Sequence, residues 1–98
     1  MVERPKWTKK DKNHPQLVEE CRKRGMVVWD VADLGGKVLD IIVFWKGQAL
    51  PVEIKSKGNE HSLTADEEES IKELGAVGIT PIVAVDIEDI LSAFREKE

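Results

Sequence analysis

The sequence predicts an α/β fold in which a single domain holds a mixed four-stranded sheet flanked by helices. Four short apolar runs have the length and the β-branched content of strands: residues 26–32, 38–45, 49–56 and 81–85. Helices are expected to begin near residues 13, 64 and 86, which gives the order α-β-β-β-α-β-α. Three successive strands followed by a helical crossover to a fourth imply both antiparallel and parallel pairing.

The composition favours a small soluble protein. Ninety-eight residues with 41% hydrophobic content suit one modest core. No apolar run approaches the roughly 18 residues of a membrane span, and the first residues lack the apolar stretch of a signal peptide. Cys21 is the single cysteine, so it forms no internal disulfide, and its apolar helical neighbours favour packing over nucleophilic chemistry. We therefore expect a cytoplasmic protein without a membrane partner.

The charges are distributed unevenly along the chain. The net charge is −4, but residues 1–24 hold eight Lys or Arg against four Asp or Glu, a local charge of +4. This predicts a basic N-terminal arm, residues 1–12, ahead of a domain at residues 13–98. Phosphate contacts are expected from lysines of the arm and of one later loop: Lys6, Lys9, Lys10, Lys12 and Lys57. The alternative for the arm is a solvated tail.

The first helix is expected to run from Asn13, as N-cap, to Gly25. Gln16 lies three residues after the cap in a box-like arrangement, and Pro15 suits the first turn. The buried stripe of this helix comprises Leu17, Val18 and Cys21.

A hairpin at residues 38–56 carries the polar residues that need explanation. The run at residues 38–45 reads as a strand buried on both faces, yet it contains the carboxylate of Asp40. A two-residue loop at residues 46–47 would place Asp40 opposite Glu53, with Lys55 on the same face as Glu53. A three-residue loop with a bulge at Gly47 is the alternative, and it would shift the facing pair by one residue.

The second and third helices have clear start signals. Thr64 followed by Glu67 forms a capping box, and this explanation of Glu67 is favoured over contact with a metal ion or water. Asp86 is the expected cap of the last helix. The buried face of that helix comprises Ile87, Ile90, Leu91 and Phe94.

The converging acids suggest metal-dependent chemistry. Asp40 and Glu53 offer hard oxygen ligands, and the carbonyl of Ile54 is a third candidate. Such a set suits Mg²⁺ or Mn²⁺ and leaves positions open for water and phosphate oxygens. Lys55 is expected to position or deprotonate the attacking water, because its pKa should fall beside a metal ion. The predicted reaction is hydrolysis of a phosphodiester.

The same residues resemble a known family. GGKVLDIIVF followed by PVEIK is similar to the signature of the PD-(D/E)xK nuclease superfamily, and most similar to its small VRR-NUC branch and the related Holliday-junction resolvases. The matching stretches are Cys21-Arg22-Lys23-Arg24-Gly25, Gly36 with Leu39-Asp40, Glu53-Ile54-Lys55, and Leu63-Thr64-Ala65-Asp66-Glu67. Three positions depart from the pattern: Leu39 replaces a proline, Gln16 a helix-one acid, and Glu67 a common glutamine.

The resemblance implies a restriction-endonuclease-like core and a catalytic set of Asp40, Glu53 and Lys55. It implies cleavage of branched or structured DNA by a homodimer, and a virus- or phage-encoded source is one option. Gln16 and Glu67 are accessory candidates, and Glu20 is a further candidate ligand.

Two other classes of function remain open. One is a nucleic-acid-binding module that has lost catalysis, and the other is a structural protein in which the acids and Lys55 form a satisfied ion cluster. His14 and His61 are expected on the surface, with His61 within reach of a phosphate. Trp29, Trp45 and the apolar face beside the last helix are candidate dimer contacts.

Overall fold

The computed structural model describes residues 11–35 and 37–97. Its elements are α1 (His14–Lys23), β1 (Val27–Asp30), the 3-10 helix η2 (Ala32–Leu34), β2 (Ile41–Trp45), β3 (Gln48–Ile54), α2 (Ala65–Ala76), β4 (Ile82–Ala84) and α3 (Ile87–Glu96). The predicted order is confirmed, with η2 as an addition between the first two strands.

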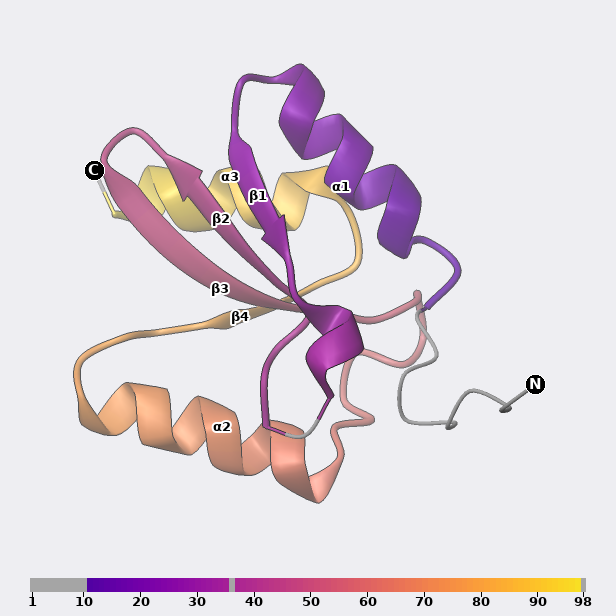
Figure 1. The fold of residues 1–98 in the computed structure, drawn as a ribbon, viewed down its shortest axis with the longest axis vertical. Helices are drawn as coiled ribbons and strands as arrows, with labels where there is room; N and C mark the ends of the chain where they lie inside the picture. Colours follow the sequence, from indigo (N-terminus) through magenta and orange to yellow (C-terminus); the bar gives the residue numbers. More distant parts are fainter. Residues whose placement is uncertain (1–10, 36, 98) are drawn as a thin grey trace.

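The four strands form one mixed sheet in the order β1-β2-β3-β4 (Figure 1). The first two pairings are antiparallel, and β4 lies parallel to β3. Helix α2 makes the crossover between these parallel strands, as the succession of elements predicts. The sheet therefore has the predicted mixed topology.

The β2–β3 hairpin has the predicted two-residue loop. Trp45 pairs with Gln48 and Ile42 with Pro51, so the bulged three-residue alternative is wrong. Lys46 and Gly47 both take positive φ angles, 52° and 75°, as a type I′ turn requires. The Lys46 ammonium lies 4.5 Å from the centroid of the Trp45 ring, a contact that favours this uncommon lysine conformation.

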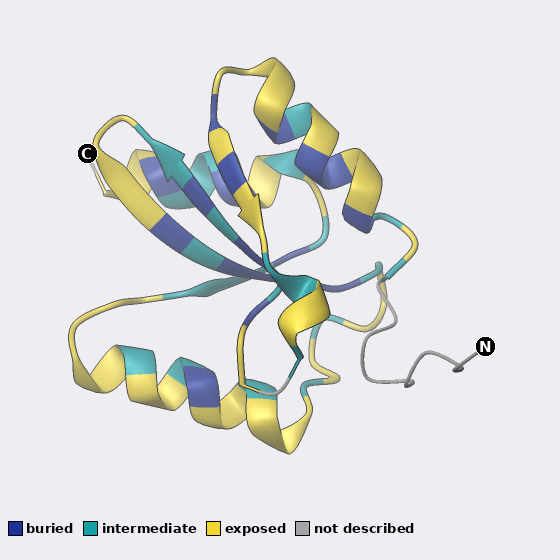
Figure 2. Cartoon of the chain, viewed as in Figure 1, coloured by how far each residue is buried: buried dark blue, intermediate teal, exposed yellow. Residues whose placement is uncertain are grey.

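One face of the sheet carries the core. Helices α1 and α3 lie over this face (Figure 1), and the buried residues gather between them and the strands (Figure 2). The predicted stripe of α1 is buried, and burial raises the pKa of the Cys21 thiol to about 11, so this thiol stays protonated and packs as an apolar group. Among the described residues, α2 contributes none to this core cluster.

The opposite face of the sheet is only partly covered. Val27 and Trp29 are more than half exposed, and Ile42 and Phe44 are half-buried. The prediction of a strand buried on both faces at residues 38–45 is therefore wrong. Alternate residues of β2 are buried in the core on the side of α1 and α3, whereas the others face the side on which α2 lies, at the bottom of the view (Figure 1).

The helix caps differ from one another. Thr64 forms the predicted capping box with Glu67, and Asp86 caps α3 in a second box with Asp89. Asn13 stands at the N-cap position of α1 but makes no side-chain cap bond, and Gln16 is exposed, so the predicted box-like arrangement is wrong. No helix in residues 11–35 and 37–97 has both the length and the apolar character for crossing a lipid bilayer.

Candidate active site

The residues of the predicted catalytic set meet where β3 ends. Asp40 directly precedes β2, and its Oδ2 accepts a hydrogen bond of 2.8 Å from the backbone N–H of Ile54. The antiparallel register, continued by one residue, places residue 40 opposite residue 53, and burial, together with the charge of Asp40, raises the pKa of Glu53. Lys55 lies two residues beyond Glu53, with its Nζ 3.8 Å from Glu53 Oε2. Sequence spacing and hairpin register together therefore bring Asp40, Glu53 and Lys55 into one cluster.

Glu67 joins this cluster from helix α2. Its Oε1 lies 3.0 Å from Lys55 Nζ and also accepts a hydrogen bond of 2.9 Å from the backbone N–H of Thr64. The capping role and the contact with the cluster are thus made by one oxygen atom. The predicted capping role of Glu67 is therefore confirmed, and the same side chain pairs with Lys55 because the N-terminus of α2 faces the end of β3.

Burial and crowding determine the protonation of the acids. Burial, followed by the hydrogen bond to Glu67 and the charge of Asp40, raises the pKa of Glu53 to about 10. Burial likewise raises the pKa of Asp40, against the opposing effect of the Ile54 N–H. At neutral pH, Glu53 therefore holds a proton and the cluster carries less negative charge than three ionised carboxylates would.

The pKa values of Glu67 and Lys55 shift in the directions expected of an ion pair. Burial opposes ionisation of Glu67, but hydrogen bonds from Glu53, the Thr64 N–H and Lys55 outweigh burial and lower its pKa. Burial also disfavours the Lys55 ammonium, yet Glu67 and Glu53 more than offset that effect and raise the pKa of Lys55. Without a bound metal ion Lys55 is therefore a cation, and the fall of its pKa expected beside a metal ion stays a prediction.

The donor set of the cluster fits a hard divalent cation. In the part of the chain that the structure describes, no three or more His, Cys, Asp or Glu side chains are arranged to hold a metal ion. Two facing carboxyls, with the Ile54 carbonyl between Glu53 and Lys55, are nevertheless what Mg²⁺ takes from a protein when water and phosphate supply its other ligands. Glu53 takes up a proton because the cluster would otherwise carry too much negative charge. A divalent cation bound here would replace that proton and neutralise the charge.

The candidate ligands on helix α1 lie outside the cluster. Gln16 is exposed, and neither Gln16 nor Glu20 makes a hydrogen bond or ion pair with the cluster among the described residues. His14 is 1% exposed, so its predicted surface position is wrong. Its Nε2 hydrogen-bonds to Asp30 Oδ2 at 3.0 Å because the first turn of α1 packs against the end of β1. Burial raises the pKa of Asp40 and His14 acts against that shift, so His14 is a neighbour of the cluster that sequence patterns missed.

Two further residues contact the main chain at Lys55. Asn13 Nδ2 donates hydrogen bonds to the carbonyl oxygens of Lys55, at 3.1 Å, and of Val85, at 2.6 Å. Asp11 Oδ1 accepts from the backbone N–H of Ser56 at 3.3 Å and from its hydroxyl at 3.1 Å. No sequence pattern indicates these contacts, because an asparagine before a helix is already explained as a cap.

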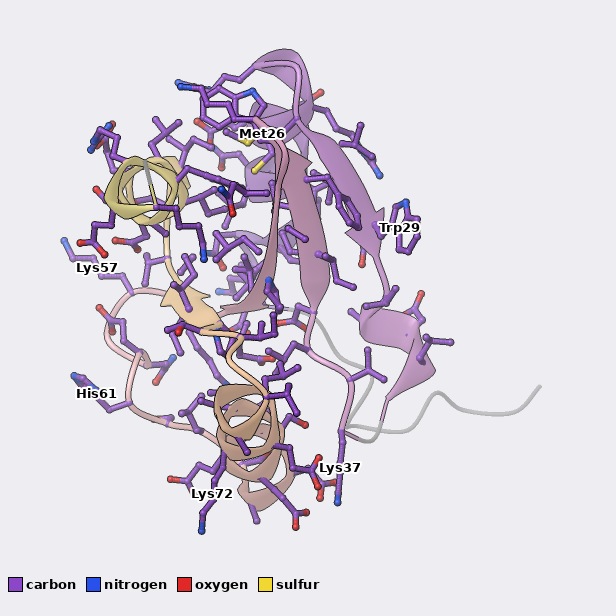
Figure 3. The ribbon with its side chains drawn as sticks, turned by 90° about the vertical axis from the view of Figure 1, so that its left-hand side faces the viewer. Met26, Trp29, Lys37, Lys57, His61 and Lys72 are labelled. Atoms are coloured by element: carbon purple, nitrogen blue, oxygen red, sulfur yellow. The ribbon has the colours of Figure 1, made fainter. Side chains whose placement is uncertain are left out.

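The structure describes two of the five basic residues that are predicted to contact DNA, Lys12 and Lys57. Lys12 and Lys57 are exposed, and each directly follows a residue of the Asp11–Ser56 hydrogen-bonded pair. Lys57 and His61 point outward on one side of the molecule, while Trp29 points outward on the other (Figure 3). His61 is exposed, as predicted. The arm lysines Lys6, Lys9 and Lys10 lie outside the described residues.

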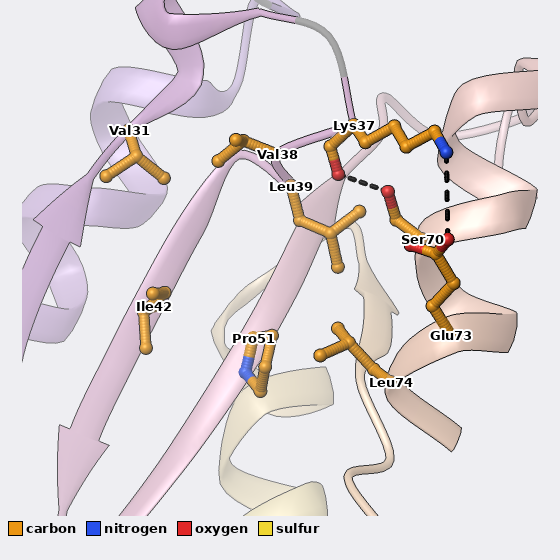
Figure 4. A pocket seen from close by; sticks show the side chains of 9 residues that line it. All are labelled: Val31, Lys37, Val38, Leu39, Ile42, Pro51, Ser70, Glu73 and Leu74. Carbon is orange, nitrogen blue, oxygen red and sulfur yellow. Dashed lines mark hydrogen bonds and ion pairs between the residues drawn. The ribbon is translucent and has the colours of Figure 1, made fainter. Parts of the chain in front are cut away.

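A separate hollow lies between α2 and the uncovered side of the sheet. Its volume is about 310 Å³, and its apolar lining includes Leu39, Ile42, Pro51 and Leu74 (Figure 4). Lys37 closes one end, where its carbonyl accepts a hydrogen bond from the Ser70 hydroxyl and its ammonium lies 2.7 Å from Glu69 Oε1. None of the four cluster residues lines this hollow, so it is distinct from the candidate active site.

Comparison with protein-family models, with curated proteins and with solved structures finds no match to this chain.

Proposed function

We propose that the protein is a metal-dependent endonuclease that hydrolyses phosphodiester bonds of branched or structured DNA. The observation that carries the proposal is the convergence of Asp40, Glu53 and Lys55 at the end of β3, with both carboxyls drawn from facing strand positions. The arrangement agrees with the resemblance of these residues to the PD-(D/E)xK nucleases of the VRR-NUC and Holliday-junction-resolvase type. Two buried carboxyls that face each other, one of which must take up a proton at neutral pH, are costly for stability alone, which favours a functional reason for the pair.

The residues of the cluster have separate roles in the proposed reaction. Asp40 and Glu53, with the Ile54 carbonyl, would hold Mg²⁺ or Mn²⁺, and this ion would stabilise negative charge on the phosphate. Lys55 orients the attacking water through its ammonium protons. Glu67, 3.0 Å from the Lys55 ammonium, keeps that side chain directed toward the acids.

The basic residues near the site supply the contacts to DNA. Asp11 and Ser56 are hydrogen-bonded, which brings the exposed Lys12 and Lys57 to the same part of the molecule, beside Lys55. Lysines there neutralise phosphates and release counterions, which makes binding depend on salt. The arm lysines Lys6, Lys9 and Lys10 are proposed to add further phosphate contacts.

A second copy of the chain is the proposed partner. Trp45 packs edge-on against Phe94, with ring centroids 5.5 Å apart, so its ring is used within the fold. Trp29 is 58% exposed and lies with Val27 and Phe44 on the uncovered face of the sheet. Of the candidate contacts, Trp29 is therefore favoured. A two-fold dimer would present two sites for cutting two strands.

A titration with Mg²⁺ and Mn²⁺ on synthetic junction, flap and linear DNA tests the proposal. The nuclease should bind the ion in the millimolar range and cut DNA, and Asp40→Asn and Glu53→Gln should abolish cutting while the fold stays intact. A catalytically inactive DNA-binding module would hold DNA without cutting it. A structural ion cluster would bind neither metal nor DNA. Binding of DNA without cutting, or no binding at all, would refute the nuclease assignment.

A further inference from the structure

The main chain at Lys55 is held on three sides. Strand β3 ends at Ile54, and the N–H of Lys55 donates to the Ala84 carbonyl at 3.0 Å. In the next peptide unit, the Lys55 carbonyl accepts from Asn13 and the Ser56 N–H donates to Asp11. The two polar groups of a single peptide are therefore bound by side chains only two residues apart in the chain.

The side chain of Asn13 binds the Lys55 carbonyl instead of capping its own helix. The backbone angles at Asn13, φ −83° and ψ −2°, are helical rather than those of a capping residue, and its side chain bonds to no N–H of α1. Its amide instead joins Lys55 to Val85, at the end of the neighbouring strand, while its Oδ1 is buried without a partner among the described residues. Helix stability alone does not account for this orientation.

The position of the Lys55 backbone matters because its side chain is long. The ammonium reaches Glu67 at 3.0 Å and Glu53 at 3.8 Å only when the Cα is correctly placed at the end of β3. A lysine has four rotatable bonds, so a loose main chain would let the ammonium occupy many positions.

We propose that Asp11 and Asn13 are positioning residues that clamp the Lys55–Ser56 peptide and so hold the Lys55 ammonium toward the acids of the site. The proposal rests on the nuclease function proposed above. It also makes the end of the basic arm part of the active site, because Asp11 belongs to that arm and accepts from the Ser56 N–H.

Matched variants separate the clamp from general stability. Asn13→Ala removes both carbonyl contacts, Asp11→Ala removes the acceptor for Ser56, and Asp11→Asn retains an acceptor oxygen. Asn59→Ala is the control, because Asn59 Nδ2 contacts the Ser56 hydroxyl at 3.0 Å without touching the clamped peptide. Cleavage is measured as kcat and KM, and Mn²⁺ affinity is measured separately by calorimetry.

The clamp predicts a fall in kcat for Asn13→Ala and Asp11→Ala on the order of 10- to 100-fold. The values of KM and Mn²⁺ affinity should change less than about threefold, since the acids are untouched. Asp11→Asn and Asn59→Ala should behave like the wild type. Unchanged kcat in a folded Asn13→Ala or Asp11→Ala protein would overturn the proposal, as would an equal loss in the Asn59→Ala control.

A measurement without DNA keeps the clamp testable if the nuclease assignment fails. The Lys55 ammonium, paired with Glu67, should give a resolved ¹⁵Nζ signal in NMR spectra, and the Ser56 amide should exchange slowly with solvent. Asn13→Ala should shift or broaden the Lys55 signal, and Asp11→Ala should accelerate the exchange at least tenfold. If neither observable changes, the clamp is refuted whether or not the protein cuts DNA.

Discussion

Replacing Glu53 with glutamine is expected to stabilise the metal-free protein, and increasingly so as the pH rises. The pKa of Glu53 is raised from 4.5 to about 10 because the carboxyl is buried and faces Glu67 and Asp40. Between these values, the unfolded chain releases the proton while the folded chain retains it. The unfolded state then binds fewer protons, so the contribution of Glu53 to the stability of the wild type is present below pH 4.5 and is lost progressively up to about pH 10.

The size of the effect follows from the same values. The decrease is about 1.4 kcal/mol per pH unit within this window, and pH 7 lies about 2.5 pH units above the ordinary pKa. Glu53→Gln, which keeps the shape and cannot ionise, should therefore be more stable than the wild type by about 3 kcal/mol at pH 7. Well below pH 4.5 the two proteins should be nearly equal, because Glu53 is then protonated in both the folded and the unfolded wild type.

Urea unfolding followed by circular dichroism at pH 5, 6, 7 and 8 measures this difference. Glu19→Gln is the control, because Glu19 is exposed on α1 and should change stability by less than about 0.5 kcal/mol at every pH. The denaturant slope should be the same in all three proteins. Parallel curves of stability against pH for Glu53→Gln and the wild type would show that Glu53 is ionised at neutral pH, and the account of a crowded acid cluster would be wrong.

Three other outcomes are expected. Mg²⁺ should bind more tightly as the pH rises from 6 to 9, because binding must displace the Glu53 proton. Calorimetry in buffers of different ionisation enthalpy should detect the release of this proton. An affinity that does not depend on pH would exclude Glu53 as a ligand. Removing residues 1–10, which leaves the Asp11 contact in place, should weaken DNA binding and flatten its salt dependence, whereas an unchanged slope would make the arm a solvated tail. Trp29→Glu should convert a dimer into an 11.0 kDa species in sedimentation at micromolar concentration; a wild type that already sediments as a monomer would refute the proposed assembly.

The parts of the fold that local patterns determine were predictable. The capping box at Thr64, the two-residue loop at residues 46–47 and the buried stripe of α1 each depend on residues within a few positions of one another. The facing of Asp40 and Glu53 follows from the loop length by counting, because an antiparallel register transmits one turn along the whole hairpin. The clustering of Asp40, Glu53 and Lys55 was therefore accessible from the sequence.

The burial of the sheet was predicted less well, for a reason that lies in the layers. An apolar run such as residues 38–45 indicates burial on both faces only when helices cover both faces. Here α1 and α3 occupy one side, and α2 leaves Trp29 and the hollow beside Ile42 uncovered. Part of the apolar pattern of β2 therefore belongs to a face of the sheet that is not fully covered. An exposed apolar face of this kind is typical of a surface that binds a partner.

The least predictable contacts are those that join α1 to the strand ends. Asn13 meets Lys55 across 42 residues and Val85 across 72, and His14 meets Asp30 across 16. Both side chains have complete local explanations, a helix cap and a surface histidine, and neither explanation is correct. A polar residue at a helix start is assigned to capping because the alternatives depend on tertiary packing, which no spacing rule encodes. Asn13 leaves its own helix without a side-chain cap and binds a distant main chain instead. A residue that does so identifies a chain segment whose position must be maintained, and here that segment carries Lys55.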